Sequence, residues 1–250
     1  MRKFGLIGYP LGHSFSRKYF TEKFKKEGIN DSQYDNYPIT DINQLKDLIS
    51  VEPELCGLNV TIPYKSEVLR FLDFIDKEAS EIGSVNVIKI NRRAGSFILS
   101  GYNSDVTGIS ETLNHYVKNK LNHAMVLGTG GSSRSVCYVL RKMGVRITMV
   151  SRESREDVIS YRDIKPDLIA DIQLIINTTP LGMYPAVEGK PALDYSLLGK
   201  NHILFDLVYN PEITSFLASG LKQGCTVITG LKMLHSQAER AWEIWNDKNL

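Results

Sequence analysis

The stretch "AMVLGTGGSSR", residues 124–134, passes from an apolar segment into a run of glycine and serine. Its first four residues have the composition of a buried β-strand, and the pattern from Ser133 to Gly144 is helical. Gly128 and Gly130 match the first two positions of Gly-x-Gly-x-x-Gly, whereas Ser133 stands at the third. Glycines here allow a tight turn and a close approach of the backbone to a pyrophosphate at the helix amino end. The stretch therefore predicts a dinucleotide-binding strand-loop-helix unit, the alternative being an ordinary glycine-rich turn.

The residues around this unit alternate regularly between strand and helix patterns. A helix is predicted after Asp105, and a final helix begins near Leu231. The predicted strands that follow the glycine loop are "RITMVS", "LIINTTP", "HILFDLVY" and "CTVIT". Such alternation is typical of a parallel sheet covered by helices on both faces, which is an α/β fold.

Residues 1–104 follow a different pattern. A strand is predicted up to Gly8, a helix stops at Gly28, and a hairpin around "NRRAG", residues 91–95, interrupts the alternation. The change of pattern near residue 104 predicts a domain boundary there. No internal repeat or Gly/Ser linker marks it.

A lysine follows a strand in "NVTIPYK", residues 59–65. Pro63 cannot donate to a sheet ladder and suits the first turn of a helix, so it is predicted to end the strand and begin a helix. The apolar stripe of that helix would be Val68, Leu69, Leu72 and Ile75. Lys65 would then lie where a strand passes into a helix, the place where α/β proteins bind ligands.

The composition excludes several classes of function. The 250 residues carry a net charge of +2 with both signs interspersed, so no basic face for nucleic acid is expected and small molecules are the predicted partners. The three cysteines lack metal or disulfide spacing, and the five histidines form no HExxH pattern, so no metal is predicted. No apolar run is long enough for a membrane span, and a cytoplasmic protein is expected.

The second predicted strand of the alternating half ends at "VSRESR", residues 150–155. An NAD-binding unit would place an acidic residue on the ribose diol here, whereas Arg152 and Arg155 match a 2′-phosphate in charge and geometry. The segment therefore indicates NADP. Glu153 opposes this interpretation, and a solvated charged turn is the alternative.

A nicotinamide cofactor transfers hydride, so reduction of a ketone also needs a proton donor for the developing alkoxide. Lys65 is one candidate and Asp105 in "GYNSDVTG", residues 101–108, is another; the aspartate would also hold the ammonium group of the lysine. Taken alone, an exposed first-turn lysine and a helix cap are the better explanations of these two residues.

Seven motifs together resemble the shikimate dehydrogenase family, in its order and spacing over essentially the whole chain. They are "GYPLGHSFS", "NVTIPYK", "GSVNVI", "GYNSDVTG", "GTGGSSR", "NTTPLGM" and "GLKMLHSQA". The resemblance implies an α/β substrate-binding domain, residues 1–104 completed by a helix at 233–250, and a Rossmann-type NADP domain at 105–232. It also implies reversible, NADPH-dependent reduction of 3-dehydroshikimate to shikimate in the pathway to chorismate and the aromatic amino acids, by a monomer or homodimer.

The resemblance also assigns residues, with Lys65 and Asp105 as the catalytic pair. The implied substrate contacts are Ser14, Ser16, Thr61, Asn86, Tyr209 and Gln237. The implied cofactor contacts are Gly128, Thr129, Gly130, Gly131, Ser132, Ser151, Arg152, Arg155, Asn177, Thr178, Leu207 and Gly230. Hydroxyls at the start of a helix suit a carboxylate, because the helix dipole favours an anion there.

Four positions depart from the family pattern: Arg17, Phe20, Glu153 and Lys232. Glu153 leaves open a quinate/shikimate dehydrogenase that uses NAD. A non-catalytic dinucleotide-binding sensor is another alternative, but it has no need for the catalytic pair and the serines together. A folate-linked dehydrogenase of similar design is disfavoured by Ser14 and Ser16.

Overall fold

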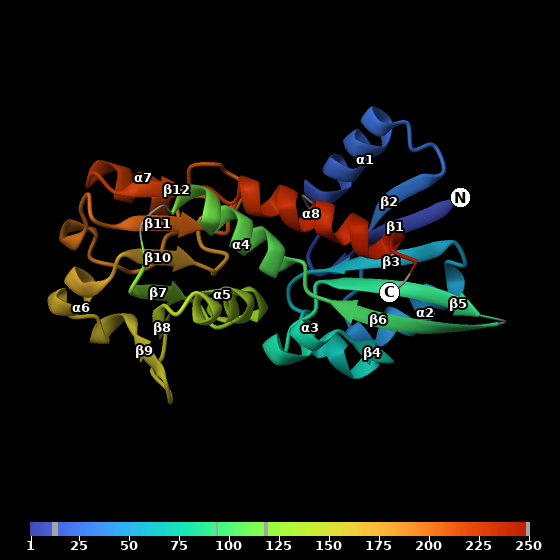
Figure 1. The fold of residues 1–250 in the computed structure, drawn as a ribbon, viewed down its shortest axis with the longest axis horizontal. Helices are drawn as coiled ribbons and strands as arrows, with labels where there is room; N and C mark the ends of the chain where they lie inside the picture. The colour runs from blue at the N-terminus through green and yellow to red at the C-terminus, as the bar shows by residue number, and fades with distance from the viewer. Residues whose placement is uncertain (12–14, 94, 118–119, 249–250) are drawn as a thin grey trace. The chain divides into compact units, whose positions relative to one another are not determined.

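The computed structural model describes residues 1–11, 15–93, 95–117 and 120–248. The chain forms two compact units, Met1–Ser104 with Ala238–Leu250, and Asp105–Gln237. Each unit is built around one six-stranded sheet (Figure 1).

The sheet of the first unit has the strand order β2-β1-β3-β5-β6-β4. Strands β1, β2 and β3 are parallel, whereas β5 and β6 form the predicted antiparallel hairpin. The strands are β1 Arg2–Gly8, β2 Ser32–Pro38, β3 Leu55–Val60, β4 Phe74–Ile75, β5 Val87–Arg93 and β6 Ser96–Tyr102. The helices are α1 Phe15–Glu27, η1 Ile42–Gln44, α2 Leu45–Val51, η2 Glu67–Phe71 and α3 Lys77–Ile82.

Both faces of this sheet are covered by a hydrophobic core, and successive strand residues point alternately into one core and the other. Leu6 packs in a core with Phe20 of α1 and Trp245 of α8, Leu231–Asn246. The neighbouring Ile7 packs in the opposite core with Ile49 of α2. The first unit therefore needs the carboxyl end of α8 to cover one face of its sheet.

The helix predicted after Pro63 is wrong. Residues 62–66 form a turn, which is followed by the 3-10 helix η2 and the short strand β4. The reason is a long-range hydrogen bond, in which the N–H of Val85 donates to the carbonyl of Lys65 at 2.8 Å and takes the acceptor that an α-helix would use. The apolar stripe is nevertheless buried, since Val68 lies in the core and Leu69 and Leu72 pack against it.

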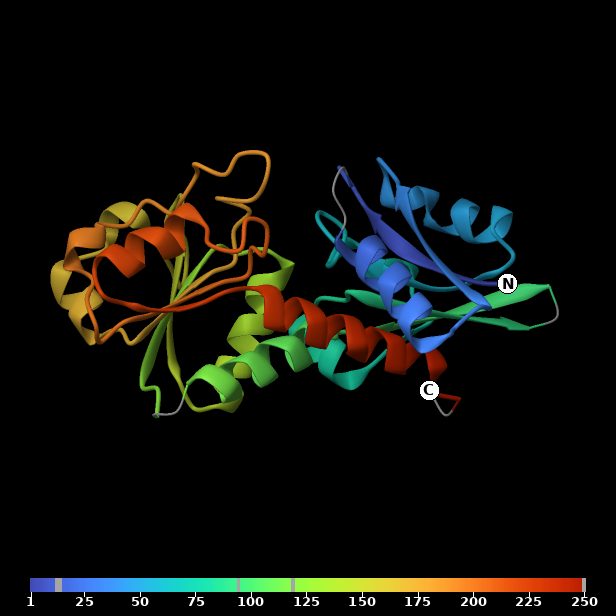
Figure 2. The same cartoon turned by 90° about the horizontal axis from the view of Figure 1, so that it is seen from above.

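The second unit contains a fully parallel sheet of order β12-β11-β10-β7-β8-β9. The strands are β7 His123–Leu127, β8 Arg146–Ser151, β9 Val158–Ser160, β10 Leu174–Asn177, β11 Ile203–Asp206 and β12 Thr226–Ile228. Besides α8, the helices are α4 Asp105–Tyr116, α5 Gly131–Lys142, η3 Tyr161–Asp163, α6 Pro166–Asp171, η4 Tyr195–Leu197 and α7 Ser215–Lys222. Figure 2 shows α4 and α5 on one face and α6 and α7 on the other. This is the doubly wound arrangement that the alternating pattern predicts.

Candidate active site

The glycine loop after β7 has the conformation that its residues predict. Gly128 has a φ of +106°, and a Cβ there would lie 2.7 Å from the Thr178 hydroxyl. Its N–H donates to the carbonyl of Val150 at 2.8 Å. Both the backbone angle and the close packing therefore require glycine, and the loop is fixed to β8 and to the end of β10.

Helix α5 begins directly behind this loop, with Gly130 as its N-cap. Among the described residues, no heavy atom outside the chain neighbours and the backbone of the helix lies within 4 Å of the place where a Cβ on Gly130 would stand, so the space beside Gly130 is open. Ser133, at the third fingerprint position, is buried and donates to the Gly130 carbonyl at 2.6 Å, which explains why a serine fits there. Open space at a helix amino end fits a pyrophosphate, because backbone N–H groups and the helix dipole both favour an anion.

The segment predicted to bind the 2′-phosphate lies at the end of β8. Ser151 is the last residue of the strand, and Arg152, Glu153 and Arg155 are exposed after it. The N–H of Arg155 donates to the carbonyl of Val158 at 2.9 Å, which closes the turn toward β9. Exposed guanidinium groups beside the glycine loop suit a phosphate, so the residues of this edge fit NADP.

The ends of β10 and β11 bring further predicted cofactor residues together. Thr178 donates from its hydroxyl to the carbonyl of Leu127 at 2.7 Å, which places it against the glycine loop. A Cβ on Gly230 would lie within 3.0 Å of the carbonyl oxygens of residues 206, 207 and 208. Leu207 and Gly230 are therefore neighbours, and only glycine permits that contact.

Asp206 is a buried carboxylate that was not predicted from the sequence. It has no exposed surface, and burial raises its pKa to about 6, against the opposing effect of its hydrogen bonds. Its donors are Asn177, Val208 and Thr214. The available signal was the charged residue inside the apolar run "HILFDLVY", because a charge in a buried strand needs partners.

Three predicted site residues of the first unit, two for the substrate and one catalytic, are connected through its sheet. Thr61 follows β3 directly, and the N–H of Val60 donates to the carbonyl of Asn86 at 2.9 Å. The Asn86 side chain is buried, donating to the Ser104 hydroxyl at 3.0 Å and accepting from the Ser104 N–H at 2.7 Å. The bond from Val85 to the Lys65 carbonyl brings Lys65 into the same group, with its side chain half-buried.

Asp105 follows Ser104 in the chain and is the first residue of α4, with a buried side chain. One turn later, a Cβ on Gly108 would lie 2.6 Å from the carbonyl of Met233 and 3.3 Å from the Cβ of Gln237. The second unit therefore brings the start of α4 close to Gln237. Tyr209 is half-buried in the loop after β11.

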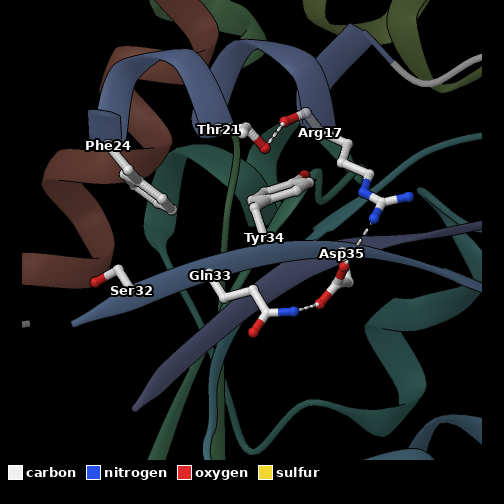
Figure 3. A pocket seen from close by; sticks show the side chains of 7 residues that line it. All are labelled: Arg17, Thr21, Phe24, Ser32, Gln33, Tyr34 and Asp35. Atoms are coloured by element: carbon white, nitrogen blue, oxygen red, sulfur yellow. Dashed lines mark hydrogen bonds and ion pairs between the residues drawn. The ribbon is translucent and has the colours of Figure 1, made fainter. Parts of the chain in front are cut away.

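Ser14 lies outside the described residues. Ser16 is half-buried in the first turn of α1, a helix of 13 residues. A separate cavity of about 220 Å³ lies beside this helix, lined by Arg17, Thr21, Phe24 and residues 32–35 (Figure 3). Arg17 lies 3.6 Å from Asp35 across it, and none of the predicted site residues that the structure describes lines it.

The described residues contain neither a membrane-spanning helix nor a metal cluster. No helix in these ranges is long and apolar enough to cross a membrane. Within the same ranges, His, Cys, Asp and Glu side chains form no group of three or more that could hold a metal ion.

Comparison with known proteins identifies the relatives of this chain. Residues 6–88 match the sequence model of the shikimate dehydrogenase substrate binding domain. The shikimate dehydrogenase (NADP(+)) of Methanococcus aeolicus is 35% identical over 258 residues, which cover 96% of this chain and 90% of the relative.

Solved structures agree in fold. Shikimate 5-dehydrogenase from Thermus thermophilus, in complex with NADP(H) and shikimate, has a TM-score of 0.84 and 28% identity over 98% of this chain and 94% of its own. Quinate dehydrogenase from Corynebacterium glutamicum, in complex with NAD, has the same TM-score and identity over 98% of this chain and 93% of its own. These comparisons confirm the predicted family, the α/β fold class, the oxidoreductase class and NADP as its cofactor. From its sequence and its fold, this chain belongs to the shikimate dehydrogenase family.

Proposed function

We propose that this chain catalyses the reversible, NADP-linked conversion of shikimate to 3-dehydroshikimate. The first unit, with the end of α8, would bind the substrate, and the second unit would bind the cofactor. The observation that carries the proposal is the loop of Gly128 and Gly130, whose backbone and open space fit a pyrophosphate at the amino end of α5.

The cofactor would be held at the carboxyl edge of the second sheet. Backbone N–H groups of residues 130–132 face the pyrophosphate, with Thr129 beside them. Arg152 and Arg155 bind the 2′-phosphate, and Ser151 lies at the same strand end. Leu207 and Gly230 would lie near the nicotinamide, which would supply the hydride when NADPH is bound, and Asn177 and Thr178 would contact the cofactor from the end of β10.

Lys65 acts as the general acid in the reductive direction. Its ammonium group donates a proton to the ketone oxygen as hydride adds to the carbon, and in the reverse direction the neutral amine accepts the hydroxyl proton. Asp105 accepts a hydrogen bond from the ammonium group and from a substrate hydroxyl, which favours the charged lysine. The proton and the hydride together balance the reduction.

The remaining polar residues bind and orient the substrate. Ser16 donates a hydroxyl hydrogen bond to the carboxylate from the first turn of α1, where the helix dipole favours an anion, and Ser14 would be a second donor. Thr61, Asn86, Tyr209 and Gln237 supply donors and acceptors for the ring hydroxyls. The half-buried positions of Ser16, Thr61, Tyr209 and Gln237 suit such contacts.

A quinate/shikimate dehydrogenase that uses NAD is the second candidate function. It is favoured by Glu153, which is exposed between the two arginines and would accept hydrogen bonds from a ribose diol. A carboxylate there repels a 2′-phosphate, but two guanidinium groups outweigh one carboxylate in charge.

A spectrophotometric assay tests both candidates. We expect NADPH to form from shikimate and NADP, with a higher kcat/KM than any pairing of NAD with shikimate or quinate. Preference for NAD and quinate would assign the second candidate, and no reduction of either cofactor would refute both.

The state of the cysteines bears on the cellular compartment of the enzyme. All three cysteines are free thiols, which favours a reducing compartment, and we propose that the enzyme acts in the cytoplasm as a monomer or homodimer. Cell fractionation and analytical ultracentrifugation test these two points.

A further inference from the structure

Asp206 joins three segments at the carboxyl edge of the second sheet. It is the last residue of β11, and its side chain is fully buried. Its Oδ1 accepts from the Asn177 amide and from the Val208 N–H, both at 3.0 Å. Its Oδ2 accepts from the Thr214 hydroxyl, the N-cap of α7, at 2.6 Å. One carboxylate thus ties together the end of β10, the loop after β11 and the start of α7.

These bonds fix the path of residues 207–209. The N–H of Leu207 donates to the Asn177 carbonyl at 3.0 Å, while Val208 is held by Asp206. Gly230 packs against the carbonyl oxygens of the same segment. The backbone at Leu207 is therefore fixed on both sides and has little room to move.

The same network extends to the glycine loop. The side-chain oxygen of Asn177 accepts from the N–H of Thr179 at 3.0 Å and from its hydroxyl at 2.6 Å. Thr178 lies between these residues. Its hydroxyl donates to the Leu127 carbonyl, and a Cβ on Gly128 would lie 2.7 Å from the same hydroxyl. Polar bonds thus connect Asp206 with the loop that would bind the pyrophosphate.

We propose that Asp206 is a positioning residue that sets Leu207 and Gly230 for the nicotinamide half of NADP, without touching the adenosine half. The inference rests on the proposed function, because it takes from that function the place of the nicotinamide. Its physical basis is the arrangement of acceptors. Three donors from three segments converge on two oxygens. Removing those oxygens leaves the Val208 N–H and the Thr214 hydroxyl without their acceptor, and leaves the Asn177 amide with the Leu181 carbonyl at 3.3 Å.

Asparagine at this position separates hydrogen bonding from charge. Its Oδ1 still accepts from Asn177 and Val208, and its amide can donate to the Thr214 hydroxyl, whose proton then turns away. Asp206→Asn should therefore keep the geometry, whereas Asp206→Ala should release the 207–209 segment. A matched control is Asp171→Ala, because Asp171 also bonds a buried side chain, His123, but precedes β10 at the opposite edge of the sheet.

The test compares two ligands by calorimetry, NADP and 2′,5′-ADP, which is the adenosine half with both phosphates. For Asp206→Ala we expect the affinity for NADP to fall about tenfold or more and that for 2′,5′-ADP to stay within about threefold. Turnover with shikimate should fall with a nearly unchanged KM for shikimate. Asp206→Asn should restore NADP affinity to within about threefold, and Asp171→Ala should leave both affinities unchanged.

Several results would overturn the inference. A folded Asp206→Ala protein that binds NADP like the parent refutes it, and an equal loss for both ligands shows a merely structural role. If Asp206→Ala does not fold, Thr214→Val removes one of the three donors and must still weaken NADP more than 2′,5′-ADP. A parent that binds NADP but does not oxidise shikimate refutes the proposed substrate only, because the two-ligand comparison still decides the role of Asp206. A parent that binds neither ligand refutes both.

Discussion

Lys65 carries the proposed proton transfer at the scale of one residue. Its carbonyl is held by Val85, so the backbone from which its side chain extends is fixed on the sheet of the first unit. A positioned acid/base group typically contributes a factor of roughly a hundred to ten thousand to turnover. Replacement by methionine keeps the length and apolar packing of the side chain but removes the proton.

We therefore expect Lys65→Met to lower turnover by roughly a hundred- to ten-thousandfold, with only a modest change in the KM for shikimate. Steady-state kinetics measure both. Lys46→Met, an exposed substitution on α2, should leave both unchanged. Turnover of Lys65→Met within about threefold of the parent would remove Lys65 from the mechanism.

In the proposed function, Arg152 selects NADP over NAD through one contact with the 2′-phosphate. Losing a charge-assisted contact to the 2′-phosphate should cost about 1.5 to 3 kcal/mol, which is roughly ten- to a hundredfold in affinity. We expect Arg152→Ala to raise the KM for NADP by that factor and to leave the KM for NAD nearly unchanged, since NAD lacks the phosphate. Arg162→Ala, in exposed η3, is the control. Equal increases in the KM for NADP and for NAD would contradict the role of Arg152 and make Glu153 the better indicator of cofactor preference.

The ionisation of Asp206 predicts a pH dependence of stability. Its pKa is raised from 3.8 to about 6 because burial disfavours the charged form. The folded protein therefore holds this proton more tightly than the unfolded chain. This tighter proton binding stabilises the folded protein fully below about pH 4, and the stabilisation is lost as the pH rises through about 6.

Asp206→Asn should thus gain stability relative to the parent between about pH 4 and 7, by at most about 3 kcal/mol. Urea unfolding across this range measures the gap, which is the difference in free energy of unfolding between the variant and the parent. The pKa of Asp171 is lowered, chiefly by its hydrogen bond with His123, so any pH-dependent gap for Asp171→Asn should lie below about pH 4. A constant gap between Asp206→Asn and the parent would mean that the carboxylate keeps an ordinary pKa.

At the scale of the element, the end of α8 docks on the sheet of the first unit through Trp245. The indole N–H donates to the Ile88 carbonyl at 3.0 Å, and the ring stacks on Phe4 with centroids 4.8 Å apart. A Cβ on Gly57 of β3 would lie 2.3 Å from the indole nitrogen. Strand and helix can therefore approach this closely only with glycine at position 57.

Gly57→Ala should destabilise the protein by roughly 1 to 3 kcal/mol, because the added methyl group must displace the tryptophan from a filled core. Chemical denaturation followed by tryptophan fluorescence tests this. Gly199→Ala is the matched control, since its Cβ would meet nothing closer than 4.0 Å. Equal stability of the two variants would show that α8 adjusts without cost.

The whole molecule consists of one continuous unit and one discontinuous unit. Residues 105–237 contain a complete parallel sheet, the helices of both its faces and every predicted cofactor residue. Residues 1–104 lack Ala238, Ala241, Ile244 and Trp245, which fill one face of the first sheet. The two halves should therefore differ in their ability to fold alone.

We expect a fragment of residues 105–237 to fold cooperatively and to bind 2′,5′-ADP, and a fragment of residues 1–104 to remain unfolded. Circular dichroism and calorimetry of both fragments provide the measurement. A cooperative unfolding transition of the shorter fragment would contradict the role of α8 in completing the first core.

The sequence by itself determined the second unit and its glycine loop. Local spacing sets those features, because the backbone angle of Gly128, the start of α5 and the strand-helix alternation depend on residues close together in the chain. The capping of η1 by Asp41 and the end of α1 before Gly28 are equally local.

Features that depend on hydrogen bonds between distant residues were decided only by the tertiary structure. Residues 62–75 carry a helical stripe, yet the bond from Val85 to Lys65 makes them a turn, η2 and β4. The partners of Asp206 are 29 and 8 residues away in the chain, apart from neighbouring Val208, so no local pattern reveals its role. A short segment takes the structure that satisfies its buried polar groups, and those partners are known only once the sheet has formed.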